Sequence, residues 1–360
     1  MAQKEAVSSA QEAPLSFQEA CSAEILEKVL TLHSQDKLFQ AHRMLEKIET
    51  SITLYKFQFA DVAESLEVVC HAEEKLNTNE TIKKIRSQIA ETSQLLKLLQ
   101  DDEGWIPLST GKYKSYYKKE QYSDLHSFKL SADLNASLLN LCVLIYEVDL
   151  YTTMFPYFKF VKEIAHPARC TKIVHWAIRT PWPISARESV VLGFAVDGLD
   201  EDDAILVHMK TIDKFDGVPL PTAPADVVRI DVHYGGFMFC PITEQKTRVT
   251  FCGNVDPKIS FIPAWAMNWI GSKIATIFLR MLERFARRIK GSEHERRFQT
   301  DRKFYDWLED LVQSYIRKRI NRDENFAAVA PLSRKSSLAS LTGSVEEEDH
   351  TLQPHIPATA

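Results

Sequence analysis

Apolar and polar side chains alternate along several segments between residues 171 and 255. In the segment 171–180, Val174, Trp176 and Ile178 occupy alternate positions. The pattern recurs further along the chain at Ile205, Val207, Met209, Val228, Ile230, Val232, Val249 and Phe251. Alternate residues of a strand point to one face, so these segments predict a broad apolar surface. Such a surface either fills a core or encloses a cavity for an apolar ligand, which gains about 0.8 kcal/mol for each methylene group that it buries.

The polar residues that lie between them are the next candidates for chemistry. They are His175, Arg179, His208, Lys210, Arg229, Asp231 and His233. One interpretation places them on the solvated outer face of a sheet. The other places one or two of them inside the cavity, where they would bind the polar head group of a ligand. A charged group in that position needs a partner, because burial of an unpaired charge is costly.

The chain carries none of the short motifs that indicate covalent or metal-assisted catalysis. G-x-S-x-G, the Walker A loop, G-x-G-x-x-G and H-E-x-x-H are all absent. The eleven histidines and six cysteines do not occur at the spacings of metal ligands, and we interpret the cysteines as reduced thiols. We therefore expect no catalytic residue, no metal and no cofactor. Catalysis by polar groups inside a cavity is an alternative that sequence spacing does not reveal.

Antiparallel strands are expected to position the apolar surface. The alternation, with turn residues between the runs, predicts strands at 171–180, 189–196, 204–212, 227–234, 237–240 and 248–255. Strand-like segments at 113–118 and 125–130 and a helix at 135–146 precede them. A long helix follows at 263–290, with an apolar stripe that includes Trp265, Trp269, Ile270, Ile274 and Phe278. This order predicts an α+β fold, in which a curved antiparallel sheet packs around a long helix.

Three motifs, in this order, resemble the START family of lipid-transfer domains. The first is Tyr146-Glu147-Val148-Asp149-Leu150-Tyr151, followed by Met154-Phe155-Pro156. The second is Pro181-Trp182-Pro183-Ile184-Ser185-Ala186-Arg187-Glu188, in which glutamate replaces the usual aspartate. The third combines Thr247-Arg248-Val249-Thr250, Val255-Asp256-Pro257 and Ile262-Pro263-Ala264-Trp265. We expect Arg187 to form a structural ion pair, with Glu188 or Asp149 as its partner.

The resemblance implies a helix-grip fold whose tunnel holds one lipid or sterol. The helix at 263–290 and the loops near Met154 and at 217–224 would form its gate. We expect the tunnel to be lined by Val174, Trp176, Ile178, Met209, Arg229, Phe237, Phe251, Trp265, Trp269, Ile270, Ile274 and Phe278.

Two observations bear on the ligand and on the alternatives. Cholesterol-carrying members of the family have a carboxylate–arginine pair in the tunnel, and the matching positions here are Val174 and Gly193. Neither is charged, which argues against a polar contact of the cholesterol type. The first alternative is an interaction or regulatory protein with a collapsed START-like domain that carries no ligand. The second is an enzyme of the helix-grip type.

The resemblance covers residues 101–292, and other segments flank it. Residues 1–15 are expected to be disordered. The region 16–100 has no proline or glycine between Phe17 and Leu99 and predicts three or four helices, with breaks at 34–36 and 77–80. These helices could bind a protein partner. A charged helix is predicted within 293–325, and 326–360 has the composition of a disordered tail.

Charge suggests which surfaces the protein contacts. The net charge of the chain is −5, and no nucleic-acid motif accompanies its basic residues. Basic residues outnumber acidic ones in the predicted helices at 273–322, which favours transient contact with an anionic membrane. The sequence has neither a secretory signal nor a spanning segment. We therefore expect a cytoplasmic lipid carrier or sensor that binds membranes peripherally.

Overall fold

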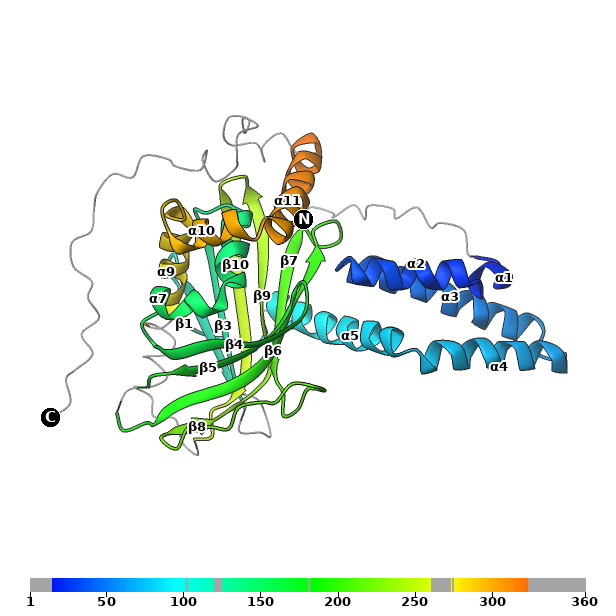
Figure 1. The fold of residues 1–360 in the computed structure, drawn as a ribbon, viewed down its shortest axis with the longest axis horizontal. Helices are drawn as coiled ribbons and strands as arrows, with labels where there is room; N and C mark the ends of the chain where they lie inside the picture. The colour runs from blue at the N-terminus through cyan, green and yellow to red at the C-terminus, as the bar shows by residue number, and fades with distance from the viewer. Residues whose placement is uncertain are drawn as a thin grey trace.

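The computed structural model describes residues 15–101, 103–119, 125–180, 182–259, 273 and 275–322. Figure 1 shows a bundle of helices beside a curved sheet that has helices of its own. This arrangement confirms the predicted α+β helix-grip fold and the all-α region that precedes it. The segments expected to be disordered, 1–15 and 326–360, lie outside the described residues except for Leu15, which packs against the helical region.

Several helices of the N-terminal helical region begin at a residue whose side chain caps the helix. Its helices are α1 (Phe17–Ala20), α2 (Ala23–Ser34), α3 (Leu38–Gln58), α4 (Ala63–Thr78) and α5 (Glu80–Gln100). Asn79 separates α4 from α5, and its side-chain oxygen accepts hydrogen bonds from the backbone N–H groups of Thr81 (3.0 Å) and Ile82 (3.1 Å). Asp36 takes a positive φ of 65° in the turn between α2 and α3. Both predicted helix breaks are therefore confirmed.

The sheet is a single antiparallel surface with one short parallel addition. Its strand order is β1-β2-β3-β10-β9-β7-β6-β5-β4, and β8 pairs with β6. The strands are β1 (Ile106–Ser109), β2 (Lys114–Lys119), β3 (His126–Leu134), β4 (Phe158–Ala168), β5 (Thr171–Ile178), β6 (Ala186–Gly198), β7 (Ala204–Thr211), β8 (Val227–Arg229), β9 (Asp231–Thr243) and β10 (Lys246–Asp256).

Two strand predictions were wrong in detail. The strands expected at 227–234 and 237–240 are the short β8 and one continuous β9, which pairs with β10 through Gly235 and Gly236. The sequence analysis also missed β4. This strand lies at the edge of the sheet, contains Pro167, and buries only Val161, so it lacks the alternation of the inner strands.

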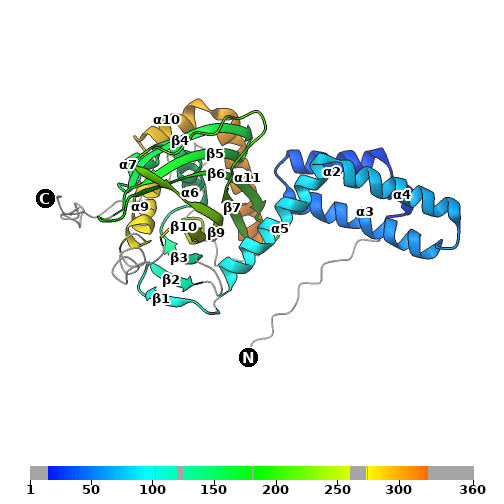
Figure 2. The ribbon, with the colours of Figure 1, turned by 90° about the horizontal axis from the view of Figure 1, so that it is seen from below.

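Helices occupy the inside of the curved sheet. They are α6 (Leu138–Tyr146), the short η1 (Val148–Leu150) and α7 (Tyr151–Met154), followed by α9 (Ala275–Arg287), α10 (Glu293–Thr300) and α11 (Arg302–Arg322). Figure 2 shows α6 within the curve of the sheet and α5 outside it. The single charged helix expected within 293–325 is divided into α10 and α11 at Asp301. The first part of the helix predicted at 263–290 lies outside the described residues.

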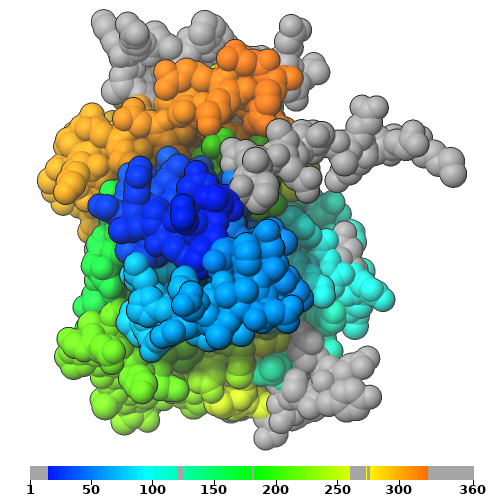
Figure 3. All heavy atoms as spheres, turned by 90° about the vertical axis from the view of Figure 1, so that its right-hand side faces the viewer, coloured from blue at the N-terminus to red at the C-terminus, as the bar shows by residue number. Residues whose placement is uncertain are grey.

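The helical region covers part of the outer face of the sheet. Leu95 and Leu99 of α5 belong to one buried cluster with Phe194, Leu206 and Met238 of the sheet. Figure 3, which views the molecule from the free end of the helical region, shows this region standing in front of the sheet. The outer face therefore contributes to a second core.

The expectation that the polar residues of the outer face are solvated is therefore wrong for His175 and His208. His208 is only 3% exposed beneath α5, where Glu91 lies 3.7 Å from its ring, and burial lowers its pKa to about 4. His175 and Glu188 are buried elsewhere on this face, with a hydrogen bond of 2.5 Å between them. These polar groups are internal, because other elements of the chain cover the strands that carry them.

Gly236 allows α5 to approach the sheet. A Cβ atom at this position would lie 2.3 Å from the carbonyl oxygen of Val207 and 2.5 Å from Leu95 Cδ2. Both distances are well below van der Waals contact, and one of them involves backbone. The absence of a side chain at Gly236 therefore brings the helical region and the sheet into contact.

We predict that Gly236→Ala destabilises the protein by about 1–3 kcal/mol, the usual cost of overpacking. It should also increase amide hydrogen exchange in α5, because the helix has to move away from β9. Urea unfolding and hydrogen exchange measure the two effects. Gly111→Ala is the matched control, since a Cβ there meets nothing within 4 Å. A Gly236→Ala protein with the stability and α5 protection of the wild type would contradict this account of the interface.

Candidate functional site: an apolar pocket inside the sheet

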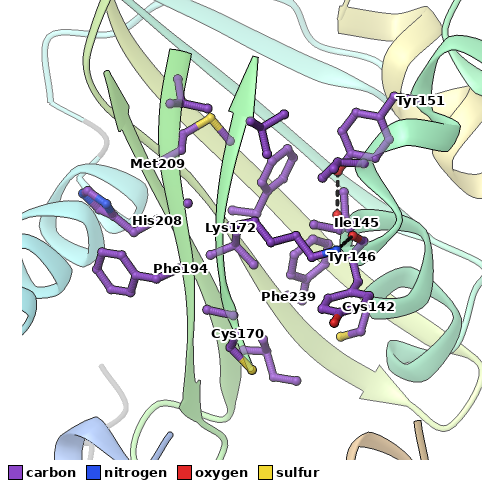
Figure 4. A pocket seen from close by; sticks show the side chains of 18 of the residues that line it. Cys142, Ile145, Tyr146, Tyr151, Cys170, Lys172, Phe194, His208, Met209 and Phe239 are labelled. Carbon is purple, nitrogen blue, oxygen red and sulfur yellow. Dashed lines mark hydrogen bonds between the residues drawn. The ribbon is translucent and has the colours of Figure 1, made fainter. Parts of the chain in front are cut away.

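A pocket of about 400 Å³ lies between the inner face of the sheet and its helices. Strands β3 to β7, β9 and β10 form one side, and α6, α7, α9 and α11 form the other. In Figure 4, Met209 and Tyr151 lie towards one end of the pocket, and Cys170 and Cys142 lie towards the other. Most of the lining is aliphatic or aromatic, so the pocket favours apolar ligands.

The structure places seven of the predicted tunnel residues on the wall of this pocket. They are Val174, Trp176, Ile178, Met209, Phe237, Phe251 and Phe278. Arg229 is not part of the lining. Its guanidinium binds the buried carboxylate of Glu188 (2.6 Å) and the carbonyl oxygen of Pro221 (2.7 Å). Trp265, Trp269, Ile270 and Ile274 lie outside the described residues, as do the first part of the predicted gate helix and the motif at 262–265.

Lys172 is a cation of the pocket wall that the sequence analysis missed. Its ammonium group donates to the backbone oxygen of Tyr146 (2.9 Å), lies 2.7 Å from the carboxylate of Glu163, and sits 3.6 Å from the centre of the Tyr146 ring. Figure 4 shows the chain of Lys172 crossing towards Tyr146. The alternation of side chains along β5 could have revealed this residue, since Lys172 lies on the same face as Val174 and Trp176.

The other polar groups of the lining differ in their contacts. Arg179 donates to the backbone oxygens of Pro156 (2.9 Å) and Phe158 (2.7 Å). Burial raises the pKa of the Cys142 thiol to about 12, so it stays protonated near neutrality. The side chain of His208 points away from the pocket towards α5 (Figure 4). The hydroxyl of Tyr157 is buried, and it has no hydrogen-bond partner among the described residues.

Comparison with known proteins identifies the fold family. The sequence pattern of the START domain matches residues 85–291, which is more than half of the chain. The chain belongs to the START domain family. The match begins inside α5 and ends before α10, so it includes the whole sheet and leaves out most of the helical region and the last two helices.

Solved START structures share the fold at low sequence identity. Human STARD10 is 15% identical, with a TM-score of 0.50 over 60% of this chain and 85% of its own. Human StAR-related lipid transfer protein 5 is 14% identical, with a TM-score of 0.50 over 57% of this chain and 96% of its own. No curated protein matches the sequence. These similarities support the START fold and leave the ligand open.

The first START motif anchors a segment beyond the matched domain. Glu147, 6% exposed at the end of α6, accepts hydrogen bonds from Arg297 of α10 (2.5 Å) and from the hydroxyl of Tyr305 of α11. Arg297 also binds both carboxylate oxygens of Asp149, at 2.8 and 2.7 Å, and holds the pKa of that carboxyl below its usual range. We call Glu147, Asp149, Arg297 and Tyr305 the carboxylate clamp.

The clamp corrects the expected role of Arg187. Asp149 pairs with Arg297, and Arg187 instead donates to the carbonyl oxygens of Pro257 (3.0 Å) and Ser185 (2.5 Å). Arg187 is therefore structural, as predicted, but it forms neither of the two ion pairs that we expected. Distant helices supply the partner of Asp149, so neighbouring sequence does not reveal it.

Within the clamp, Arg297→Met should destabilise the protein by about 2–4 kcal/mol, because it leaves the buried Glu147 without its cation. Chemical unfolding of the full chain measures this change. Arg296→Met is the control, since Arg296 is exposed and binds only Glu293 among the described residues, and it should leave stability unchanged. Equal effects of the two substitutions would show that the clamp does not hold the C-terminal helices.

Proposed function

We propose that the protein binds one lipid or other hydrophobic ligand in this pocket and acts as an intracellular carrier or sensor. The observation that carries the proposal is an apolar space of about 400 Å³ inside a well-packed START domain. Packed cores contain few voids larger than a water molecule. An apolar space of this size is suited to a ligand, which would bind mainly by desolvation.

The charges of the pocket favour a ligand whose buried part is neutral. The ammonium of Lys172 is already matched by Glu163, and Arg179 is held by backbone oxygens. Neither cation is available to an anionic head group without loss of these contacts. The hydroxyl of Tyr157 remains available, and it can donate a hydrogen bond to an oxygen atom of the ligand.

This arrangement weighs against the two alternatives. A collapsed domain would fill the space with side chains, whereas the pocket is open. Catalysis by a helix-grip enzyme needs polar groups free to act on the substrate. Lys172 and Arg179 of the lining are engaged in other contacts, which leaves the neutral hydroxyl of Tyr157. We therefore propose a role in binding, without a catalytic step.

Ala195→Phe is expected to abolish ligand binding by filling the pocket. Ala195 lines the pocket from β6, opposite Val207 of β7. The measurement is uptake of fluorescent acyl lipids and sterols by the purified full chain. Ala168→Phe is the matched control, because it makes the same change at an exposed position of β4.

The proposal predicts saturable uptake by the wild type and by Ala168→Phe, and at least ten-fold weaker uptake by Ala195→Phe. Circular dichroism shows whether each variant is folded. Equal uptake by the two variants would place the ligand elsewhere. No uptake by the wild type from either lipid class would favour the ligand-free interaction protein.

We also propose that α9 makes the contact with membranes. Arg280, Arg284, Arg287, Arg288 and Lys290 are exposed on α9 and just after it, and we call them the basic row. None of them forms an ion pair within the described part of the chain, and Arg280 lies over the ring of Tyr113. By contrast, Arg297, Lys318, Arg319 and Arg322 bind carboxylates of the sheet domain.

The basic row and the pocket share one helix. Phe278 of α9 lines the pocket, and Leu279 and Leu282 are buried in the core. Contact of the row with an anionic surface would therefore bring the covering helix of the pocket to the membrane. No helix in the described residues is long and apolar enough to span a bilayer, and the proposed contact is peripheral.

A double substitution, Arg284→Ser with Arg287→Ser, should weaken binding to phosphatidylserine vesicles about thirty-fold, at roughly 1 kcal/mol for each basic residue. Vesicle co-sedimentation at low and physiological salt measures it. The control is Lys318→Ser with Arg322→Ser, which removes the same charge from α11, where both residues pair with acids. If the control weakens binding as much, net charge and not the basic row determines the contact.

A further inference from the structure

The ligand pocket extends beyond the matched START domain. Phe304, Trp307, Leu308 and Leu311 of α11 belong to its lining, although the match ends at residue 291. Their spacing of three, one and three residues places them on one face of the helix. We call these four residues the end wall. Asp36, from the turn between α2 and α3, also borders the pocket.

Strand register shows which end of the pocket α11 closes. The lining runs along β6 from Val191 to Asp197, a length of about 20 Å at the rise of a strand. The Asp197 end leads into the β6–β7 turn, where Lys318 of α11 binds Asp200 and Arg319 binds Asp203. The end wall therefore lies at this end, and Ile178, which pairs with Arg187 at the start of β6, lies towards the other.

Aromatic and charged contacts hold the end wall in place. The ring of Phe304 stacks on that of Tyr146 at 3.8 Å. The guanidinium of Arg169, in the turn between β4 and β5, lies 4.7 Å from the centre of the Trp307 ring and 3.3 Å from the carboxylate of Asp36. The carboxylate clamp fixes the start of α11 through Tyr305. Trp307 therefore packs against Arg169, whose guanidinium is in turn paired with Asp36 of the helical region.

We propose that the end wall sets the length of the ligand, with Trp307 and Leu311 as the residues that determine specificity. This inference rests on the proposed function of the pocket. A chain that enters from the opposite end meets these side chains after it has crossed the apolar lining. Each further methylene group improves binding roughly four-fold while there is room for it, and the gain ends where the chain reaches Trp307.

The test compares the binding of neutral, saturated long-chain alcohols that differ in length by two carbon atoms. They are supplied from phosphatidylcholine vesicles to the full chain, and binding is measured by native mass spectrometry. For the wild type we expect affinity to rise with length and then to fall. Trp307→Ala should move the optimum towards longer alcohols and change the affinity ratio of the two lengths around the optimum by about ten-fold. Leu311→Phe should move it towards shorter ones.

Opposite shifts in the two variants distinguish a wall from general loss of stability, which would lower the affinity for all lengths together. Ser314→Ala, at an exposed position of the same helix, is the control and should leave the optimum unchanged. If the wild type binds the alcohols and both wall variants keep its optimum, the end wall does not set the length. If the wild type takes up neither these alcohols nor the fluorescent lipids, the proposed function itself fails, and this inference fails with it.

Discussion

The buried carboxylate of Glu147 is the constraint on which the rest of the pocket depends. A carboxylate that is 6% exposed has to be compensated, and Arg297 and Tyr305 provide the compensation from helices about 150 residues further along the chain. This requirement connects the end of α6 to α10 and α11. It thereby fixes the far end of a pocket whose other walls come from the sheet. The clamp lies within the chain itself, so it holds α11 in place whether or not a ligand occupies the pocket.

The sheet separates two environments. Its inner face carries apolar side chains around an unfilled space, while its outer face is covered in part by α5 and carries paired polar groups. Gly236 permits the close contact on the outside, and Lys172 is neutralised by Glu163 on the inside. The inner face and the part of the outer face beneath α5 are therefore both internal. The helical region is thus part of the packing of the sheet and also borders the pocket through Asp36.

Sequence reasoning identified the features that depend on local pattern. Alternation located the inner strands, and the same alternation selected Val174, Trp176 and Ile178 as one face, which the structure places on the pocket wall. The analysis failed where distant elements decide the environment. Arg229 was assigned to the tunnel, but β8 carries it to Glu188 on the other face. Lys172 was missed because only the apolar positions of its strand face were assigned to the tunnel. The end wall was missed because the family resemblance stops before it, although the spacing of Phe304, Trp307, Leu308 and Leu311 already indicated an apolar stripe.

The central claim is that the pocket is a binding site for a hydrophobic ligand and not a packing defect. The most direct measurement is native mass spectrometry of the full chain purified from a eukaryotic host, followed by mass analysis of its organic extract. The account predicts an added mass of one ligand per chain, which disappears on denaturation and reappears in the extract as a lipid or other hydrophobic molecule. A native mass equal to that of the bare chain, with no uptake when the same protein is incubated with mixed lipid vesicles, would contradict it.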